Sequence, residues 1–374
     1  MEHYDAIVVG AGIAGCSVAY FLKEKGLKVL VVDRAGVAVA GGSAAAGAFV
    51  SPKIGKGSSL QKLTNEAFEF AKDFYKENFS EYFRQTGVVR IPKDEDDAKK
   101  FFEYEKYNSS SFRWIDSKRL KEIGIKDSKD SFLFEEAGVC DAPNICRAIL
   151  DGIEYTQYNV KSLNYKNKMW YIGRYRAKNL ILATGYENRF FDMRYMGVKG
   201  TWGSRGDYET KLNLEVSMHK SISISANIDG IVKVGATHTK EAHACLNCGT
   251  DPLKELFVKA SKMVDTSDFK PKEIFCGMRS GSKDYFPLVG SVIDVSMMLR
   301  EYPKLVKGER LKEEPKKIKN LYVINGLGGR GFVFAPLMGK ILAENIVDAK
   351  LIDSRVNPDR LFLKWCRKSP ELNR

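Results

Sequence analysis

The sequence predicts a mixed α/β (α+β) fold, in which one domain is built on a parallel sheet and a second, β-rich domain is inserted into it. Three observations support this prediction. A strand, a glycine-rich turn, a helix and a second strand follow one another within residues 4–33, as in a βαβ unit. Residues 221–237 alternate between apolar and polar, and a second glycine cluster precedes an apolar helix at 326–346. We expect the first domain to comprise residues 1–80, 140–198 and 276–374, and the second to comprise 81–139 and 199–275.

The N-terminal unit has the sequence YDAIVVGAGIAGCSVAYFLKEKGLKVLVVD, with Gly10, Gly12 and Gly15 between its first strand and its helix. The first glycine permits a tight turn, the second lets the backbone approach a pyrophosphate, and the third lets helix and strand pack closely. Asp33 ends the second strand, where a carboxylate can accept a hydrogen bond from a ribose hydroxyl. The unit therefore predicts a Rossmann-like, dinucleotide-binding site.

Two further segments bear on the choice between FAD and NAD. Residues 41–52, GGSAAAGAFVSP, are mostly small, where a dehydrogenase would continue with alternating strands and helices. The apolar strand at 179–182 ends in Ala-Thr-Gly at 183–185, whose small side chains let the chain pass beside a cofactor. A flexible loop could have the same composition as 41–52. Taken together with the glycine cluster at 326–331, however, these segments favour FAD.

The spacing of apolar residues predicts further elements. Residues 60–79 have helical spacing, which indicates a helix facing the core. Residues 221–237 predict a hairpin centred on Asp229 and Gly230. The other expected elements are a strand at 87–91, a solvated helix start rather than a metal site at 94–97, a meander of short strands at 161–182 and a strand at 320–325.

Composition narrows the class of protein. The chain has 374 residues, of which 44% are hydrophobic, so about two domains with substantial cores are expected. The net charge of +13 favours polyanionic partners, nucleic acid first, although a generally basic proteome is an alternative. No uncharged stretch is long and apolar enough to span a membrane. Seven scattered cysteines and no cleavable signal before the first strand indicate a cytoplasmic protein without a disulfide framework or a membrane partner.

Five motifs, GAGIAG, GGSAAAG, GATH, GMRSGSKDYFPLVG and GLGGRGFVFAPL, occur in the order of the D-amino-acid-oxidase-like flavoproteins. This superfamily includes glycine oxidase and sarcosine oxidase. The C-terminal third resembles one branch in particular, the FAD-dependent oxidoreductase domain of the bacterial tRNA 5-methylaminomethyl-2-thiouridine biosynthesis protein. The resemblance runs from about residue 4 to residue 368 and implies a D-amino-acid-oxidase/glycine-oxidase-like fold with non-covalently bound FAD. A methyltransferase domain precedes this one in bifunctional members, so we expect a stand-alone oxidoreductase here, with a separate methyltransferase as a candidate partner.

The resemblance implies FAD-dependent oxidation of the 5-carboxymethylaminomethyl side chain of wobble uridine in tRNA, giving 5-aminomethyluridine and glyoxylate. Such a step needs a neutral amine and a fixed carboxylate beside the flavin. Because an arginine fork can bind both oxygens of a carboxylate, Arg279 and Arg330 are the candidates, with a structural salt bridge as the alternative for each. Two other activities stay open: oxidation of free small amines such as glycine, sarcosine or D-amino acids, and flavin-containing RNA binding without turnover.

The motifs also predict a set of site residues. Tyr285 is expected to line the substrate site, with plain packing beside Pro287 as the alternative, and no protein side chain is expected to carry the redox step. The expected cofactor-binding residues are Gly10, Ala11, Gly12, Ile13, Ala14, Gly15, Asp33, Arg34, Gly42, Ser43, Ala45, Ala46, Gly47, Val160, Ala183, Thr184, Gly185, Gly328, Gly329, Gly331 and Phe332.

Cysteine and histidine residues raise two further possibilities, a zinc site and a covalent bond to the flavin. His238, His243, Cys245 and Cys248 have donors suited to zinc, but their spacing matches no common zinc finger, so we expect an ordinary reduced loop and no metal. Cys276 resembles the cysteine that attaches flavin covalently in sarcosine oxidases. It is offset by one residue, so covalent attachment is not expected.

The segment at 304–319 is rich in cations, with seven Lys or Arg and three Glu, which gives a local net charge of +4. If tRNA is the partner, this segment is the best local candidate for a basic surface at the mouth of the substrate pocket. A solubilising surface loop is the alternative.

Overall fold

A computed structural model describes residues 1–239, 248, 251–369 and 372, and its strands form three sheets. The first sheet contains β1 (Glu2–Val9), β2 (Val29–Asp33), β9 (Glu154–Gln157), β10 (Asn164–Lys166), β11 (Met169–Ile172), β12 (Tyr175–Leu182), β18 (Leu288–Ile293) and β19 (Lys317–Asn325). The second contains β5 (Val88–Arg90), β6 (Arg113–Ile115), β7 (Ser131–Phe134), β13 (Lys199–Glu209), β14 (Ser217–His219), β15 (Ser223–Ile224), β16 (Ile231–Gly235) and β17 (Lys270–Gly281). The third contains β3 (Phe49–Val50), β4 (Phe83–Arg84) and β8 (Gly138–Cys140).

Helices connect and cover these sheets, which confirms the mixed α/β fold. The α-helices are α1 (Ile13–Glu24), α2 (Gly41–Ala44), α3 (Ser59–Asn78), α4 (Glu95–Glu105), α5 (Ser117–Glu122), α6 (Ala142–Ile149), α7 (Asp251–Ser261), α8 (Val295–Glu301), α9 (Gly331–Asp348) and α10 (Asp359–Lys368). The 3₁₀ helices are η1 (Arg194–Met196), η2 (Pro303–Lys307) and η3 (Gly328–Arg330).

The first sheet has a parallel centre, as the N-terminal βαβ unit predicts. Strand β1 pairs in parallel with β2 and with β12, and β12 pairs in parallel with β19. Successive side chains of a strand point to opposite faces, so β1 contributes to two cores. Ala6 and Val8 pack in the core that includes α1 and α9, whereas Ile7 and Val9 pack in the core that includes α10.

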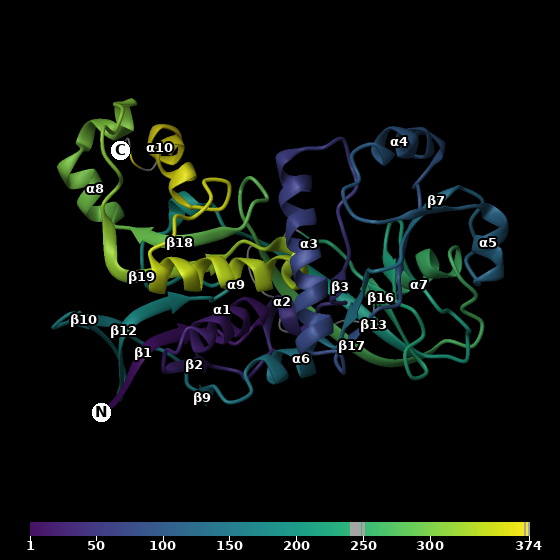
Figure 1. Ribbon diagram of the computed structural model, residues 1–374, viewed down its shortest axis with the longest axis horizontal. Coiled ribbons are helices and arrows are strands. Elements are labelled where there is room, and N and C mark those ends of the chain that lie inside the picture. The colour runs from purple at the N-terminus through teal and green to yellow at the C-terminus, as the bar shows by residue number, and fades with distance from the viewer. Residues whose placement is uncertain (240–247, 249–250, 370–371, 373–374) are drawn as a thin grey trace.

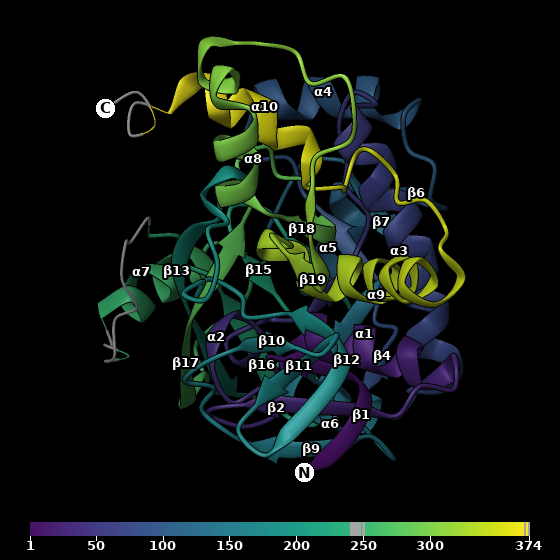
Figure 2. The same cartoon turned by 90° about the vertical axis from the view of Figure 1, so that its left-hand side faces the viewer.

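Three helices pack together beside the glycine-rich segments. Helix α9 packs against α1 and against α3, and Figure 2 shows the three helices grouped on the right-hand side. Helix α3 is the helix expected at residues 60–79. The hydroxyl of its Tyr75 donates a hydrogen bond to the carbonyl oxygen of Phe332 at the start of α9 (2.9 Å). This contact fixes α3 against the segment in which the C-terminal glycine cluster ends.

The second sheet follows the order β17-β13-β16-β15-β14-β5-β7-β6. The predicted hairpin is confirmed, because β15 and β16 are antiparallel neighbours and Asp229 and Gly230 have φ angles of 53° and 82° in their connection. The predicted solvated helix start is also confirmed. Asp94 precedes α4, and its carboxylate accepts a hydrogen bond from the N–H of Asp97 (2.8 Å).

The two large sheets lie at opposite ends of the molecule. In Figure 1, β10, β18 and β19 lie on the left, β7 and α5 lie on the right, and β3, α2 and β17 lie between them. The second sheet takes its strands from residues 88–134 and 199–281, so the boundary expected at residue 276 falls inside β17. None of the described helices has the length and apolarity needed to cross a membrane.

Candidate active site

The turn between β1 and α1 packs against a distant segment. Gly10 has a φ angle of 112°, which residues with a side chain rarely adopt. A Cβ atom at Gly10 would lie 2.3 Å from the carbonyl oxygen of Ala183, and one at Gly15 would lie 1.8 Å from the carbonyl oxygen of Gly10. Both glycines are therefore required for the close approach of this turn to residues 183–185.

Asp33 supports the same turn from the end of β2. One carboxylate oxygen accepts a hydrogen bond from the N–H of Ala11 (2.8 Å), and the other accepts one from the N–H of Ala35 (2.8 Å). Each carboxylate oxygen has two lone pairs, so Asp33 can still accept a hydrogen bond from a ribose hydroxyl. The next residue, Arg34, is exposed and forms an ion pair with Glu187 (Nη1–Oε2 2.9 Å).

The small residues of α2 lie between α1 and β17. The Ser43 hydroxyl oxygen accepts a hydrogen bond from the N–H of Ile13, the first residue of α1 (3.0 Å). A Cβ atom at Gly42 would lie 3.3 Å from backbone of β17, and one at Gly277 would lie 2.1 Å from the carbonyl oxygen of Gly41. Larger residues would push α2 and β17 apart, so the composition of this segment reflects close packing.

Asn325 joins three segments of the site and was missed in the sequence analysis. Its side chain is 4% exposed. Its Nδ2 donates to the carbonyl oxygen of Gly185 (2.7 Å), and its Oδ1 accepts hydrogen bonds from the Ser280 hydroxyl (2.8 Å) and from the N–H of Gly326 (2.7 Å). Because Ser280 directly follows Arg279, Asn325 helps to hold that part of β17 against the two glycine-containing turns. The sequence did contain a signal for this role, because Asn325 is a polar residue between an apolar strand and a glycine cluster.

The C-terminal glycine cluster forms the turn between β19 and α9. Gly326 and Gly328 have φ angles of 71° and 59°. A Cβ atom at Gly331 would lie 3.3 Å from the side chain of Ile13, so the start of α9 lies close to the start of α1. Phe332 follows and is 4% exposed. The glycines therefore serve both the turn and the approach of the two helices.

Arg279 is half-buried on β17 and is held by the segment after β16. Its Nη2 donates a hydrogen bond to the carbonyl oxygen of Thr237 (2.6 Å), and its Nη1 lies 3.2 Å from Nδ1 of His238. Burial, and then repulsion from Arg279, lower the pKa of His238, so its neutral ring can accept this hydrogen bond. Within the described part of the chain, Arg279 forms no ion pair with a carboxylate, so the salt-bridge alternative finds no support there.

Arg330 comes from the other side of the site, at the end of η3. Its Nη1 donates a hydrogen bond to the carbonyl oxygen of Ser51 (3.2 Å), and burial lowers its pKa to about 10. It too has no carboxylate partner among the residues that the structure describes. A Cβ atom at Gly329 would lie 3.7 Å from Nη1 of Arg279. The structure thus brings Arg279 close to the glycine cluster that carries Arg330.

A family model described as FAD dependent oxidoreductase matches residues 5–345. The chain belongs to this family. It is 25% identical over 397 residues to the tRNA 5-methylaminomethyl-2-thiouridine biosynthesis bifunctional protein MnmC of Legionella pneumophila, a match that covers 99% of this chain and 59% of the relative. The protein of the same name from Marinobacter nauticus is 24% identical over 371 residues, covering 91% of this chain and 55% of the relative. The chain therefore spans less than two thirds of the length of these curated relatives.

Solved structures show the same fold. Glycine oxidase from Bacillus cereus superimposes with a TM-score of 0.74 at 17% identity, covering 94% of this chain and 100% of that one. L-Proline dehydrogenase from P. horikoshii gives a TM-score of 0.73 at 16% identity, covering 96% and 98%. The predicted D-amino-acid-oxidase/glycine-oxidase-like fold is therefore confirmed.

The residues of this FAD-dependent oxidoreductase fit its cofactor. The turn at 10–15 leaves no room for a side chain at Gly10 or Gly15, and the N-terminus of α1 offers N–H groups to a pyrophosphate. Asp33 has acceptor capacity for the adenosine ribose. The contacts expected at all the cofactor-binding positions stay predictions, including that of Val160, which is 6% exposed in the core beside β2.

Tyr285 is exposed, whereas Arg279 and Arg330 are half-buried. It is 76% exposed and has a φ angle of 68°. The neighbouring Asp284 is anchored by Arg360, whose Nε donates to its carboxylate (2.8 Å). The structure therefore places Tyr285 at the surface, and its contact with a substrate stays a prediction.

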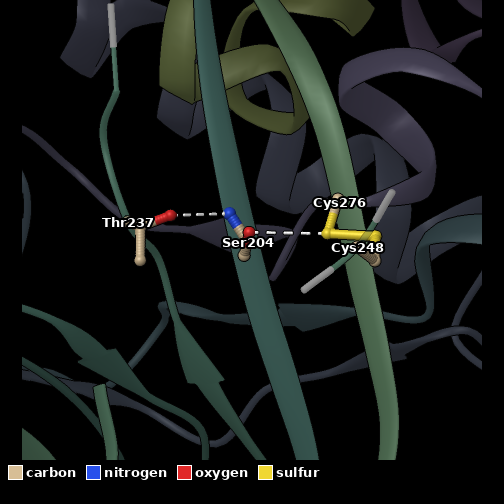
Figure 3. The surroundings of a disulfide bond; sticks show 4 residues. All are labelled: Ser204, Thr237, Cys248 and Cys276. Atoms are coloured by element: carbon tan, nitrogen blue, oxygen red, sulfur yellow. Dashed lines mark hydrogen bonds between the residues drawn. A yellow bond between two sulfur atoms is a disulfide. The ribbon is translucent and has the colours of Figure 1, made fainter. Parts of the chain in front are cut away.

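The cysteine loop differs from the expectation of a reduced segment. Cys276 on β17 forms a disulfide with the exposed Cys248, and Figure 3 shows the Ser204 hydroxyl beside the Cys276 sulfur (3.4 Å). The reason is spatial: the chain that leaves β16 returns to β17, a pairing that sequence spacing does not reveal. Because the Cys276 sulfur is bonded to Cys248, this arrangement is compatible with non-covalent FAD.

The zinc alternative concerns the same loop. His243 and Cys245 lie outside the described residues, and His238 contacts Arg279. No group of three or more potential metal ligands occurs within the described residues. The expectation of no metal stays a prediction.

The cationic segment at 304–319 lies far from the two arginines, contrary to the expectation that it borders the pocket. Its Lys317 begins β19 and Asn325 ends it, so the strand separates them by about 26 Å. In Figure 1, α8, which contacts η2, lies at the left-hand end of the molecule. Lys316 and Lys317 are also in ion pairs, with Glu301 and Asp359. The segment therefore lies away from the two arginines, and its contact with tRNA stays a prediction.

Proposed function

We propose that the protein uses FAD to oxidise the 5-carboxymethylaminomethyl side chain of the wobble uridine in tRNA, producing 5-aminomethyluridine and glyoxylate. One observation carries the proposal: Arg279 is half-buried and fixed by Thr237 and His238, yet has no carboxylate partner in the described structure. The similarity to the MnmC proteins over almost the whole chain supports the choice of substrate.

Arg279 and Arg330 would bind the carboxylate of the substrate side chain. Each guanidinium uses some of its five N–H donors on backbone oxygens, which fixes its orientation and leaves the others for the ligand. A bidentate contact would hold the adjacent methylene carbon in one place. Since the donors are oriented in advance, little freedom is lost when the substrate binds.

The reaction removes a hydride, and with it two electrons, from a C–H bond of that methylene carbon, and the bond from this carbon to the amine nitrogen becomes a double bond. When bound, FAD supplies the acceptor for the hydride that leaves the carbon. The nitrogen loses its proton, water adds to the resulting C=N bond, and cleavage releases glyoxylate and the primary amine. The amine must be neutral before oxidation, and the cations Arg279 and Arg330 favour this state because they oppose a further positive charge nearby.

Free N-substituted glycines and amino acids are the competing substrates, because they carry the same carboxylate and amine. Glycine oxidase shares the fold with this chain, but its 17% identity supports the fold alone. The net charge of +13 favours a polyanionic substrate. The same proposal places the reaction in the cytoplasm and makes a separate methyltransferase a candidate partner for the product.

Nucleoside analysis tests the proposed function directly. The FAD-loaded protein is incubated with tRNA that contains 5-carboxymethylaminomethyluridine, and nucleosides and glyoxylate are quantified. We expect the modified nucleoside to be converted to 5-aminomethyluridine, with one glyoxylate released per nucleoside. Unchanged tRNA together with rapid oxidation of glycine or sarcosine would overturn the proposal.

A further inference from the structure

Two cations outside the predicted motifs, Lys53 and Arg90, lie near Arg330. Lys53 lies two residues beyond Ser51, the acceptor of the Arg330 hydrogen bond, and its own N–H donates to the side chain of Asn65 (2.8 Å). Arg90 ends β5 in the second sheet and pairs in register with His219 of β14. The cluster therefore combines residues from both sides of the site. We call Lys53, Arg90 and Arg330 the inner cations.

Val50, Val88 and Phe332 belong to one hydrophobic core, which places the chain near Lys53, Arg90 and Arg330 in the same part of the molecule. The directions of the pKa shifts agree with this placement. Repulsion from Arg330, after burial, lowers the pKa of Lys53 and that of Arg90. Repulsion from Arg90 is the largest cause of the strongly lowered pKa of His219. Asp97 acts on Arg90 in the opposite direction but forms no ion pair with it among the described residues. The inner cations thus repel one another, and among the described residues none of them is in an ion pair with a carboxylate.

The arrangement resembles a binding site more than a structural ion-pair network. Desolvated charges that lack a partner cost free energy, and such arrangements concentrate at functional sites. One substrate carboxylate carries a single negative charge, which Arg279 with its oriented fork can bind. The inner cations therefore have capacity for a further anionic group of the substrate.

We propose that Lys53 and Arg90, together with Arg330, form a subsite for a phosphodiester of the nucleotide chain next to the oxidised uridine. The inference rests on the proposed function and names how that substrate would be recognised. Lys53 and Arg90 would position the polynucleotide, while Arg279 binds the carboxylate. The cofactor pyrophosphate is a poorer occupant, because its cradle at residues 10–15 belongs to the first sheet, whereas Arg90 and His219 come from the second.

Two substrates separate this role from a role in carboxylate or flavin binding. One is the free 5-carboxymethylaminomethyl nucleoside, which has no phosphate, and the other is the same nucleoside within a short anticodon-loop oligoribonucleotide. Lys53→Gln and Arg90→Gln are compared with Arg113→Gln, which makes the same charge change at an exposed ion pair with Glu135 on the second sheet. All are assayed with FAD bound, and the FAD affinity of each is measured.

We expect each inner-cation variant to lower kcat/KM for the oligonucleotide about tenfold, as for one charge-assisted hydrogen bond. The kcat/KM for the nucleoside should change less than twofold. The slope of the logarithm of the oligonucleotide binding constant against the logarithm of salt concentration should become shallower by about one. Equal losses for both substrates, a lowered FAD affinity, or equal losses in Arg113→Gln would overturn the proposal. If Arg90→Gln fails to fold, Lys53→Gln alone decides between these outcomes.

A separate measurement applies if the wild-type protein oxidises neither substrate, in which case the proposed function fails. Inorganic phosphate is titrated against the FAD-loaded protein while the His219 ring resonances are followed by NMR. A saturable upward shift of the His219 pKa that Lys53→Gln weakens supports the anion subsite. The absence of any saturable response in the wild type overturns it.

Discussion

Two groups of cations in this molecule differ in how they are arranged, and the contrast shows which kind of charge marks a site. The segment at 304–319 concentrates seven cations in one short stretch, yet Lys316 and Lys317 are paired with carboxylates and lie at one end of the molecule. Arg279 and the inner cations come from four separate parts of the chain. They are half-buried and form no ion pair within the described structure.

The difference follows from electrostatics. An exposed ion pair is screened by water and salt, and contributes about 0–1 kcal/mol. A half-buried cation without a partner keeps a strong field, because less water surrounds it. An incoming anion gains most at the second kind of position. Unpaired, convergent cations should therefore matter more for function than cations that are paired with carboxylates, such as Lys316 and Lys317.

The largest effect on activity is expected from a substitution that weakens FAD binding and leaves both groups of cations unchanged. Gly10→Ala would place a Cβ atom 2.3 Å from the oxygen of Ala183 in a residue with φ of 112°. The clash is with backbone, which cannot rotate away, so relief of it should cost about 3 kcal/mol, the upper end of the range for overpacking. We therefore expect FAD affinity to fall about 100-fold. Flavin fluorescence on titration of the apoprotein measures it.

Gly26→Ala is the matched control for that variant. Gly26 also has a positive φ, 82°, but a Cβ atom there would meet nothing within 4 Å. This variant should lose some stability from backbone strain and keep its FAD affinity. Equal loss of FAD in both variants would show that backbone strain, rather than the packing of the turn on residues 183–185, controls cofactor binding.

Changing a convergent cation should have the next largest effect. Arg279→Lys keeps the charge but loses the fork, so kcat/KM should fall about ten- to a hundredfold while FAD stays bound. Arg330→Lys should act in the same direction. Steady-state kinetics and the flavin spectrum check both, with Arg300→Lys on the exposed end of α8 as control. Wild-type kinetics in Arg279→Lys would mean that the carboxylate is bound elsewhere.

The sequence predicted local structural features better than it predicted which distant residues come together in the fold. The glycine turn, the carboxylate at its side and the hairpin at Asp229 depend on neighbouring residues, because turn chemistry and strand alternation are local. Asn325 and Arg90 owe their roles to partners far away in the chain. The disulfide between Cys248 and Cys276 has the same origin. Such contacts depend on how the sheets meet, which periodicity does not contain.

A smaller effect concerns the pH dependence of stability. The folded protein holds His219 neutral, so below about pH 6.5 the unfolded state binds more protons and stability falls as pH falls. Arg90→Gln removes the largest cause of the lowered pKa. The loss of Tm between pH 7.5 and pH 5 should therefore be smaller in the variant, by about 1–3 °C. Thermal unfolding of the FAD-loaded protein measures this, and Arg113→Gln should behave like the wild type. A Tm loss as large in Arg90→Gln as in the wild type would mean that other groups keep His219 neutral.

The smallest effect is expected in the dense cationic segment. Lys312→Gln, Lys316→Gln and Lys317→Gln are combined, although two of these lysines already neutralise Glu301 and Asp359. Ion pairs with carboxylates leave few counterions to release on tRNA binding, so affinity should fall less than about threefold and the salt slope should change by less than about one. Breaking the pairs should lower stability by about 0–1 kcal/mol each. Filter binding of tRNA over a range of salt concentrations measures the affinity, with the Lys53→Gln and Arg90→Gln double variant for comparison. If the triple variant loses more affinity than this double variant, tRNA binds along the end of the molecule near α8, and unpaired charge is the poorer guide to its path.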